Sequence, residues 1–213
     1  MLAAKGIVIG SFCRSIGNVE DCDERGIEDA KRSEGFPTRA CTPELDAMMS
    51  DCIMAARKDM DSVGGVVECI VTGLPIGFGG IWFESLDAEL AHAVFGIPAC
   101  KGVEFGKGFD ITRMRGSESN DAYRMKDGRI VTKTNNMGGV VGGMSDGADL
   151  VFRAAFKPTP SIGAKQETVD LKTCEDAELE IKGRHDPCIA PRAASVVEAV
   201  TALVLADQME RGL

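Results

Sequence analysis

The apolar pattern of the chain changes at about Lys101, and this change constrains the fold more than any other feature. Before Lys101, helix-like and strand-like segments alternate, whereas short strand-like segments follow it up to a final helix. This order predicts an α+β fold of mainly antiparallel strands covered by helices. Because no internal repeat and no low-complexity linker divides the chain, we expect residues 1–213 to form a single domain.

The clearest predicted helix begins at Thr42-Pro43. A threonine side chain can accept hydrogen bonds from the free N–H groups of a first helical turn, where proline is also tolerated. The apolar residues on one face of this helix are Leu45, Met48, Met49, Cys52, Ile53 and Ala56. We expect this face to fill the core, with its methionines as packing residues. The charged residues 20–39 predict a solvated loop or a polar surface helix.

The remaining expected elements are apolar runs bounded by glycine, proline or polar turn residues. Strands are expected at residues 7–12, 66–72, 103–105 and 150–156, with a hairpin that turns on Asp127-Gly128 and a strand pair within residues 167–181. Helices are expected to end at residue 6 and to span residues 86–97 and about 193–209. The last helix has Val196, Val197, Val200, Leu203 and Val204 on one face, which we expect to be buried.

Composition limits the possible partners. A net charge of −9 opposes binding to nucleic acid, so an anionic ligand needs a local basic cluster. No apolar run approaches the roughly 20 residues that cross a bilayer, and no secretory signal is present at the start. We therefore expect no membrane partner and a cytoplasmic location. The 8 cysteines form no CxxC pair, which indicates reduced thiols and neither a metal site nor a disulfide framework.

The segment richest in glycine is TNNMGGVVGGMSDG, residues 134–147. Its glycine pairs permit positive φ and close backbone approach, so its N–H groups could wrap an anion or a planar ring. An ordinary glycine-rich turn between two strands is the alternative. The segment matches neither the GxGxxG dinucleotide pattern nor a P-loop, because no GK[ST] follows.

Two later segments concentrate charged and hydroxyl groups. In KPTPS, residues 157–161, a lysine and two hydroxyls stand on a proline-stiffened turn, a set that can hold phosphate. The alternative is a strand exit with a solvated lysine. In GRHDPC, Arg184, His185 and Asp186 place a cation, an imidazole and a carboxylate before a helix. The alternative there is an Arg–Asp pair that holds a loop.

Two further polar positions are expected to be structural. His92, in LAHAV, is expected to be a hydrogen-bonded packing histidine. Asp61-Ser62 is expected to cap and turn the chain between a helix and a strand.

Several motifs occur in a fixed order: DSVGG, LDAELAHAV, KGVEFG, TNNMGGVVGGMSDG, VFRAAFKPTPSI, QETVD, and GRHDPC followed by PRAASVVEAVTALVLAD. In this order, from Met1 to Asp207, they resemble the chorismate synthase family. The resemblance implies an incomplete sandwich of antiparallel sheets and helices, a homotetramer, and an association with NADP. The family converts 5-enolpyruvylshikimate 3-phosphate into chorismate and phosphate, a redox-neutral 1,4-elimination that requires reduced FMN.

The resemblance also implies roles for individual residues. By position, the family's FMN contacts are Pro98, Ala99, Gly142, Lys157, Pro158, Thr159, Pro160, Ser161 and Arg184. Asp186 matches a carboxylate that is proposed to help remove a proton from the substrate. Relatives often have asparagine at position 98, so Pro98 either keeps a backbone contact or has lost a side-chain contact.

Family motifs similar to GESHG, RPGHAD and GRSSARET are absent from this sequence. We therefore expect the chain to correspond to the C-terminal part of the family, without an N-terminal segment. In the family, those motifs contain two catalytic histidines and most substrate-binding arginines, so we expect little or no activity from this chain alone. The alternative is a noncatalytic flavin-binding or oligomerisation module that needs a separate N-terminal chain.

Overall fold

The computed structural model describes residues 1–126, 128–183 and 185–212. Its centre is a five-stranded sheet with the strand order β2-β1-β3-β9-β4. The strands are β1 (Val8–Ile16), β2 (Val19–Glu20), β3 (Gly65–Thr72), β4 (Cys100–Phe105) and β9 (Leu150–Phe156). All neighbouring strands in this sheet are antiparallel, which confirms the predicted α+β class.

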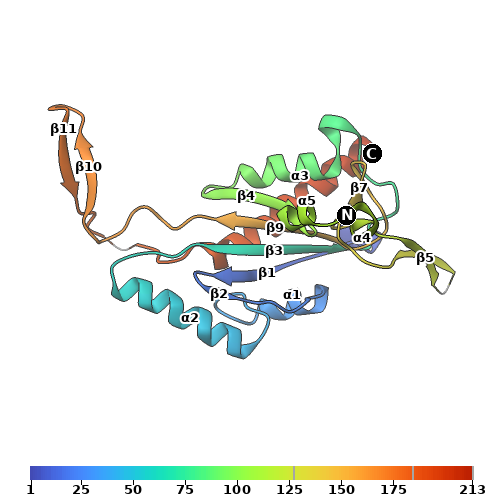
Figure 1. Cartoon of the computed structure of the whole chain (residues 1–213), viewed down its shortest axis with the longest axis horizontal. Helices are drawn as coiled ribbons and strands as arrows, with labels where there is room; N and C mark the ends of the chain where they lie inside the picture. Colours follow the sequence, from blue (N-terminus) through green and yellow to red (C-terminus); the bar gives the residue numbers. More distant parts are fainter. Residues whose placement is uncertain (127, 184, 213) are drawn as a thin grey trace.

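Helices pack against both faces of this sheet (Figure 1). α5 (Ala190–Arg211) crosses β1 and β3, and α3 (Leu86–Phe95) packs beside α5 and over β4. On the opposite face, α1 (Ile27–Ser33) covers β1, where Ala30 packs with Phe12 and Ile70. α2 (Pro43–Lys58) lies beside β1 and β2 at one edge of the sheet.

Strand alternation produces two separate apolar layers, because successive side chains point to opposite faces of a sheet. Toward α3 and α5, the buried strand residues include Val67, Cys69 and Val71 of β3 and Leu150, Phe152, Ala154 and Phe156 of β9. The cysteines are free thiols, as predicted, and Cys13, Cys41, Cys69, Cys100 and Cys188 are buried. Burial raises the pKa of Cys69 to about 12, so this thiol stays protonated and acts as a small apolar residue.

The face of the sheet opposite α5 contains a row of alternating charges. Arg14 of β1 pairs with Glu68 of β3 at 2.8 Å, with side chains 14% and 5% exposed. Glu68 lies opposite Arg153 of β9, which in turn pairs with Glu104 of β4 at 2.9 Å. Burial raises the pKa of Glu68, and the Arg14 guanidinium opposes this rise. The pairs therefore compensate charges that the sheet removes from water.

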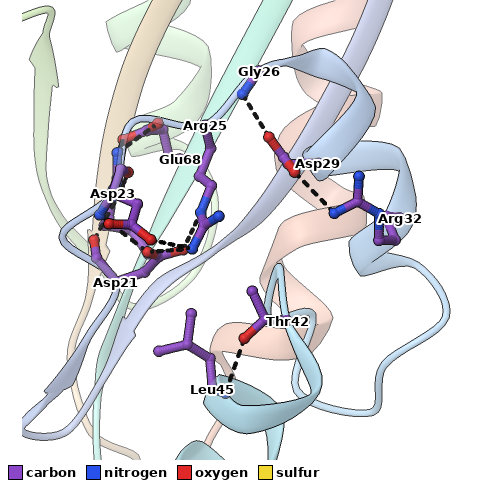
Figure 2. Close-up of polar contacts among 10 residues, drawn as sticks. Asp21, Asp23, Arg25, Gly26, Asp29, Arg32, Thr42, Leu45 and Glu68 are labelled. Atoms are coloured by element: carbon purple, nitrogen blue, oxygen red, sulfur yellow. Dashed lines mark hydrogen bonds and ion pairs between the residues drawn. The ribbon is translucent and has the colours of Figure 1, made fainter.

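The loop before α1 closes beside this row. Arg25 donates to both carboxylate oxygens of Asp21 at 2.8 and 2.9 Å, and it also contacts Asp23 (Figure 2). The Gly26 N–H donates to the Asp29 carboxylate at 3.1 Å, which fixes the first turn of α1. The charged residues 20–39 thus form a loop followed by a short polar helix, a combination of the two predicted forms.

The predicted start of α2 is confirmed, but its predicted buried face is partly wrong. Thr42 Oγ1 accepts a hydrogen bond from the Leu45 N–H at 3.2 Å (Figure 2). Only Met49 and Ala56 are buried on this helix, and Met48 is 55% exposed. Because α2 lies at the edge of the sheet, only a narrow stripe of its apolar face meets the core.

The buried face of α5 agrees only in part with the predicted one, because Val197 is buried and Val200 and Val204 pack against the core. Its buried residues are Ala190, Ala193, Ala194, Val197, Thr201, Leu205 and Gln208. Val196 and Leu203, both expected to be buried, are 44% and 70% exposed. Small side chains permit close approach of α5 to β1 and β3, and residues 199–206 are apolar on nearly every side, so periodicity alone does not define the buried face.

Three hairpins lie outside the central sheet. The arm formed by β10 (Gln166–Asp170) and β11 (Glu175–Leu179) projects from one end of the molecule, and β5 (Tyr123–Lys126) with β6 (Arg129–Thr132) projects from the other (Figure 1). Both predicted pairings are confirmed, although Asp127 lies outside the described residues.

The short elements are η1 (Leu2–Lys5), η2 (Trp82–Glu84), η3 (Gly108–Arg113), α4 (Gly116–Ser119), β7 (Val140–Val141) and β8 (Met144–Ser145). Within the described ranges, we find no helix with both the length and the apolar character to cross a membrane.

Candidate functional site

The loop at the end of β9 is tied to the turn that precedes β4. The Lys157 N–H donates to the Ala99 carbonyl at 3.0 Å. Ala99 has a φ of 70°, a left-handed conformation that is uncommon for a residue with a side chain. Its surroundings must therefore hold the turn in place. The structure thus brings Pro98 and Ala99 next to the 157–161 loop, as a shared binding site requires.

The turn at Asp61-Ser62 joins the same region. The Ser62 hydroxyl donates to the Thr159 carbonyl at 2.7 Å, and the Val63 N–H donates to the Pro187 carbonyl at 2.8 Å. Thr159 Oγ1 is buried and has no hydrogen-bond partner among the described residues. A buried hydroxyl without a partner is costly, so this atom marks a place where a polar group can bind.

Two cavities open beside these loops. The first has a volume of about 400 Å³ and is lined by residues at the end of α2 and on both sides of the arm, including Asp61, Lys182 and Pro187. The second has a volume of about 510 Å³ and is lined by Arg57, His185, Asp186, Pro187 and Arg192. Both volumes lie within the range typical of small-molecule sites. The two cavities adjoin, because Arg57, His185, Asp186 and Pro187 line both of them.

The Asp186 carboxylate is held by the beginning of α5. Its Oδ1 accepts from the Cys188 N–H at 3.4 Å. Its Oδ2 has no hydrogen bond of ordinary geometry in the described structure and is neutralised by the Arg192 guanidinium instead. The Asp186 side chain is 26% exposed, so a ligand in either cavity can reach it. Asp186 thus pairs with Arg192, and the alternative prediction of a pair between Arg184 and Asp186 stays untested because Arg184 lies outside the described residues.

His185 is oriented by the backbone. Its Nε2 lies 3.1 Å from the Ile181 carbonyl. Because a carbonyl only accepts, Nε2 must be the protonated nitrogen, which leaves Nδ1 as an acceptor when the ring is neutral. The hydrogen bond fixes the imidazole between the two cavities.

The glycine-rich segment uses its N–H groups within the chain. The Asp121 carboxylate accepts from the N–H groups of Asn136 and Met137, each at 2.8 Å, and from the Thr134 hydroxyl at 2.7 Å. An acidic side chain of the protein therefore occupies the position that the sequence suggested for an anionic ligand. This part of the segment is a structural turn, which was the alternative prediction.

Gly142 lies apart from the other predicted flavin residues. With Gly143 it forms the two-residue turn between β7 and β8, and the two residues have φ of 63° and 90°. The Gly143 carbonyl accepts from the Leu86 N–H at 2.8 Å, which docks the turn against the start of α3. β9 separates this turn from Lys157 by roughly 20 Å, at about 3.3 Å per strand residue. One chain does not bring Gly142 to the Lys157 loop.

Arg57 and Arg192 line the second cavity, and neither of them was predicted from the sequence to have a role. Arg57 belongs to the last turn of α2, and Arg192 belongs to the first turn of α5. The sequence shows only that each arginine lies near the end of a predicted helix and close to a predicted loop. The fold is needed to show that the end of α2 and the beginning of α5 line the same cavity. The expected packing role of His92 is wrong, because its side chain is exposed on the outer face of α3.

Comparisons with known proteins agree on one family. The family model described as "Chorismate synthase" matches residues 1–209. The chain is 47% identical over 211 residues to "Chorismate synthase" of Methanosarcina barkeri and covers 58% of that protein. It is 49% identical over 210 residues to "Chorismate synthase" of Archaeoglobus fulgidus, again covering 58%. A solved structure titled "Crystal Structure of Chorismate Synthase" superposes with a TM-score of 0.82 at 31% identity, over 100% of this chain and 59% of the other.

Proposed function

Since the chain belongs to the chorismate synthase family, we propose that it supplies the flavin-holding part of a chorismate synthase active site. The chain spans 58% of the length of the curated relatives that it matches. We propose that it corresponds to their C-terminal part and folds as a single domain. The proposed reaction is the 1,4-elimination of phosphate from 5-enolpyruvylshikimate 3-phosphate to give chorismate, in the biosynthesis of aromatic amino acids.

The observation that supports this proposal best is the buried Thr159 hydroxyl without a partner. It lies in a loop that is fixed at the Lys157 N–H by Ala99 and at the Thr159 carbonyl by Ser62. A fixed loop with an unsatisfied hydroxyl is suited to a polar cofactor, because a site that is already ordered loses little conformational freedom on binding. The residues present therefore fit FMN.

In this proposal, residues 98–99 and 157–161 hold FMN, with Pro158 and Pro160 stiffening the loop and Lys157 supplying a cation. When bound, reduced FMN would supply an electron-rich ring with no net redox change over the reaction. We place the substrate in the cavity of about 400 Å³, whose lining includes Ile162 and Gly163 directly after the 157–161 loop. Ser161 and Arg184 complete the proposed set, and Gly142 is its least supported member because β9 separates it from the rest.

Asp186 is the proposed acceptor of a substrate proton. It lines both cavities, and Arg192 together with the Cys188 N–H keeps its carboxylate in one orientation. A carboxylate that is fixed by a cation is poised to receive a proton without first rotating.

The outer face of α5 supports the proposal that further family sequence covers this chain. Leu203 is 70% exposed and Val196 is 44% exposed, on a helix whose central residues are nearly all apolar. A helix that is apolar on all sides is normally buried on all sides. We propose that the remaining family length supplies this cover, and that the complete assembly is a cytoplasmic homotetramer.

A direct test is an assay of chorismate formation with reduced FMN and the substrate. We expect little or no product from this chain alone and measurable turnover when the N-terminal part of the Archaeoglobus fulgidus relative is added. Turnover by neither mixture, although FMN binds, would favour the second candidate, a noncatalytic module. That candidate is supported by the exposed apolar side chains of Val196 and Leu203, which can pack against another chain.

A further inference from the structure

The open cavity of about 510 Å³ lies between two helix ends that the proposed flavin contacts do not use. Arg57 reaches it from the last turn of α2, and Arg192 reaches it from the first turn of α5. His185 and Asp186 form the wall between them. Two guanidinium groups therefore face one space from two different directions.

In the described structure, both arginines have guanidinium N–H donors that no protein group uses. The Arg57 side chain is exposed and forms no ion pair within residues 1–126, 128–183 and 185–212. Arg192 is 74% exposed and contacts Asp186 through one of its terminal nitrogens. Because a guanidinium has five N–H donors, most of the Arg192 donors remain free.

The charge of the cavity lining differs from that of the whole chain. The chain has a net charge of −9, yet this cavity is lined by two arginines and an imidazole against the single carboxylate of Asp186. The neighbouring cavity shares Arg57, His185, Asp186 and Pro187 with this one, but Asp61, Glu180 and Lys182 line only the neighbouring cavity. The positive end of the α5 dipole adds to the local potential.

We propose that Arg57 and Arg192 form a binding subsite for a phosphate group beside Asp186. Guanidinium groups match phosphate oxygens with paired N–H donors, and two of them from separate helices balance a dianion. The inference deepens the proposed function and rests on it for biological meaning, because the proposed substrate is a phosphate ester. Phosphate binding itself is measured independently of flavin binding and of turnover.

The proposal predicts the direction in which a substitution of Asp186 changes the affinity for phosphate. Its carboxylate already neutralises part of Arg192, so it acts as a built-in competitor of an incoming anion. Asp186→Asn removes the negative charge and keeps the side-chain shape. The subsite therefore predicts tighter phosphate binding in this variant, whereas a purely structural Arg–Asp pair predicts no gain.

The test is a titration of the whole chain with inorganic phosphate at pH 7.5 and constant ionic strength, followed by NMR of the backbone amides around residues 185–192. We expect saturable binding in the wild type. Arg57→Gln and Arg192→Gln should each weaken it by about tenfold, since each removes charge-assisted hydrogen bonds. Arg57→Lys and Arg192→Lys, which keep the charge, should lose less affinity.

The matched control is Lys58→Gln, which removes an exposed charge from the next position of α2 and lines neither cavity. We expect it to bind phosphate as the wild type does. The proposal is overturned if the wild type shows no saturation, if Lys58→Gln loses as much affinity as Arg57→Gln, or if Asp186→Asn binds phosphate more weakly. If the wild type binds phosphate but does not bind FMN, the result counts against the proposed function and supports the phosphate subsite.

Discussion

Arg14 and Glu68 form an ion pair whose side chains are only 14% and 5% exposed. Arg14→Met leaves the buried Glu68 carboxylate without its ion-pair partner, so that Arg153 on β9 is the nearby cation that remains. Because an uncompensated buried charge is strongly destabilising, we expect the free energy of unfolding to fall by about 3–5 kcal/mol. Urea unfolding at pH 7, followed by circular dichroism, measures this loss.

Arg113→Met is the matched control for Arg14→Met. Arg113 pairs with Asp110 at 3.2 Å, but the two side chains are 84% and 73% exposed. Water solvates such a pair well, so we expect a change within about 1 kcal/mol. Equal losses for the two substitutions would show that burial does not determine the importance of the Arg14 pair.

Asp149 provides a pH-dependent test near the glycine-rich segment. Partial burial raises the pKa of this carboxyl above its ordinary value of 3.8. Burial favours the neutral form of this carboxyl in the folded state. Its contribution to stability is therefore complete below about pH 3.8, where the carboxyl is neutral in the unfolded chain too, and is lost as the pH rises through the higher folded-state pKa. Asp149→Asn stays neutral throughout.

We therefore expect Asp149→Asn to gain stability relative to the wild type as the pH rises from 3.5 to 7. Urea midpoints at several pH values measure this difference, and the substitution's other effects appear as a constant offset. A difference between the two proteins that does not change with pH would contradict the account of Asp149.

At the scale of elements, Thr42 fixes the start of α2 through one hydrogen bond. Its Oγ1 accepts from the Leu45 N–H, which has no partner inside the helix. We expect Thr42→Ala to lower the free energy of unfolding by about 1 kcal/mol. Thr42→Ser retains the hydroxyl, so it should stay close to the wild type in the same urea experiment. If the serine variant loses as much as the alanine variant, the cap is not the cause.

Helices and strands were predictable where residues close together in the sequence determine them. The cap at Thr42, the strand at residues 150–156 and the hairpin of β5 and β6 follow from nearby residues alone. The buried face of α5 does not, because alanine and valine occur on several sides of the helix. Contact with β1 and β3 selects the side with the smaller residues, and that selection depends on the tertiary fold.

The site was predictable from the sequence only in part, for the same reason. Lys157, Thr159 and Asp186 each belong to a local motif, and the structure places them at one end of the sheet. Arg57 and Arg192 become neighbours only through the packing of α2 and α5 around that end. The Asp121 carboxylate, which accepts from the Asn136 and Met137 N–H groups, precedes the glycine-rich segment, so its part in this turn could not be predicted from the motif.

At the scale of the whole molecule, the outer face of α5 tests whether further sequence covers the chain. Leu203 is 70% exposed, whereas Leu205 is fully buried. We expect Leu203→Lys to change the free energy of unfolding by less than about 0.5 kcal/mol and to reduce self-association in sedimentation experiments. Leu205→Ala should cost about 2–5 kcal/mol. A similar cost for both substitutions would mean that Leu203 is already buried in this chain.

The central claim is that the loop after β9 holds flavin, and a titration with FMN tests it most directly. Flavin fluorescence should show saturable binding, alone or with an added N-terminal family segment. Lys157→Met and Thr159→Val should each weaken it by about tenfold. Lys165→Met, which removes a 69% exposed lysine from the adjacent arm, should bind as the wild type does. The claim is contradicted if the wild type does not bind FMN under either condition, or if Thr159→Val and Lys157→Met bind it as tightly as the wild type.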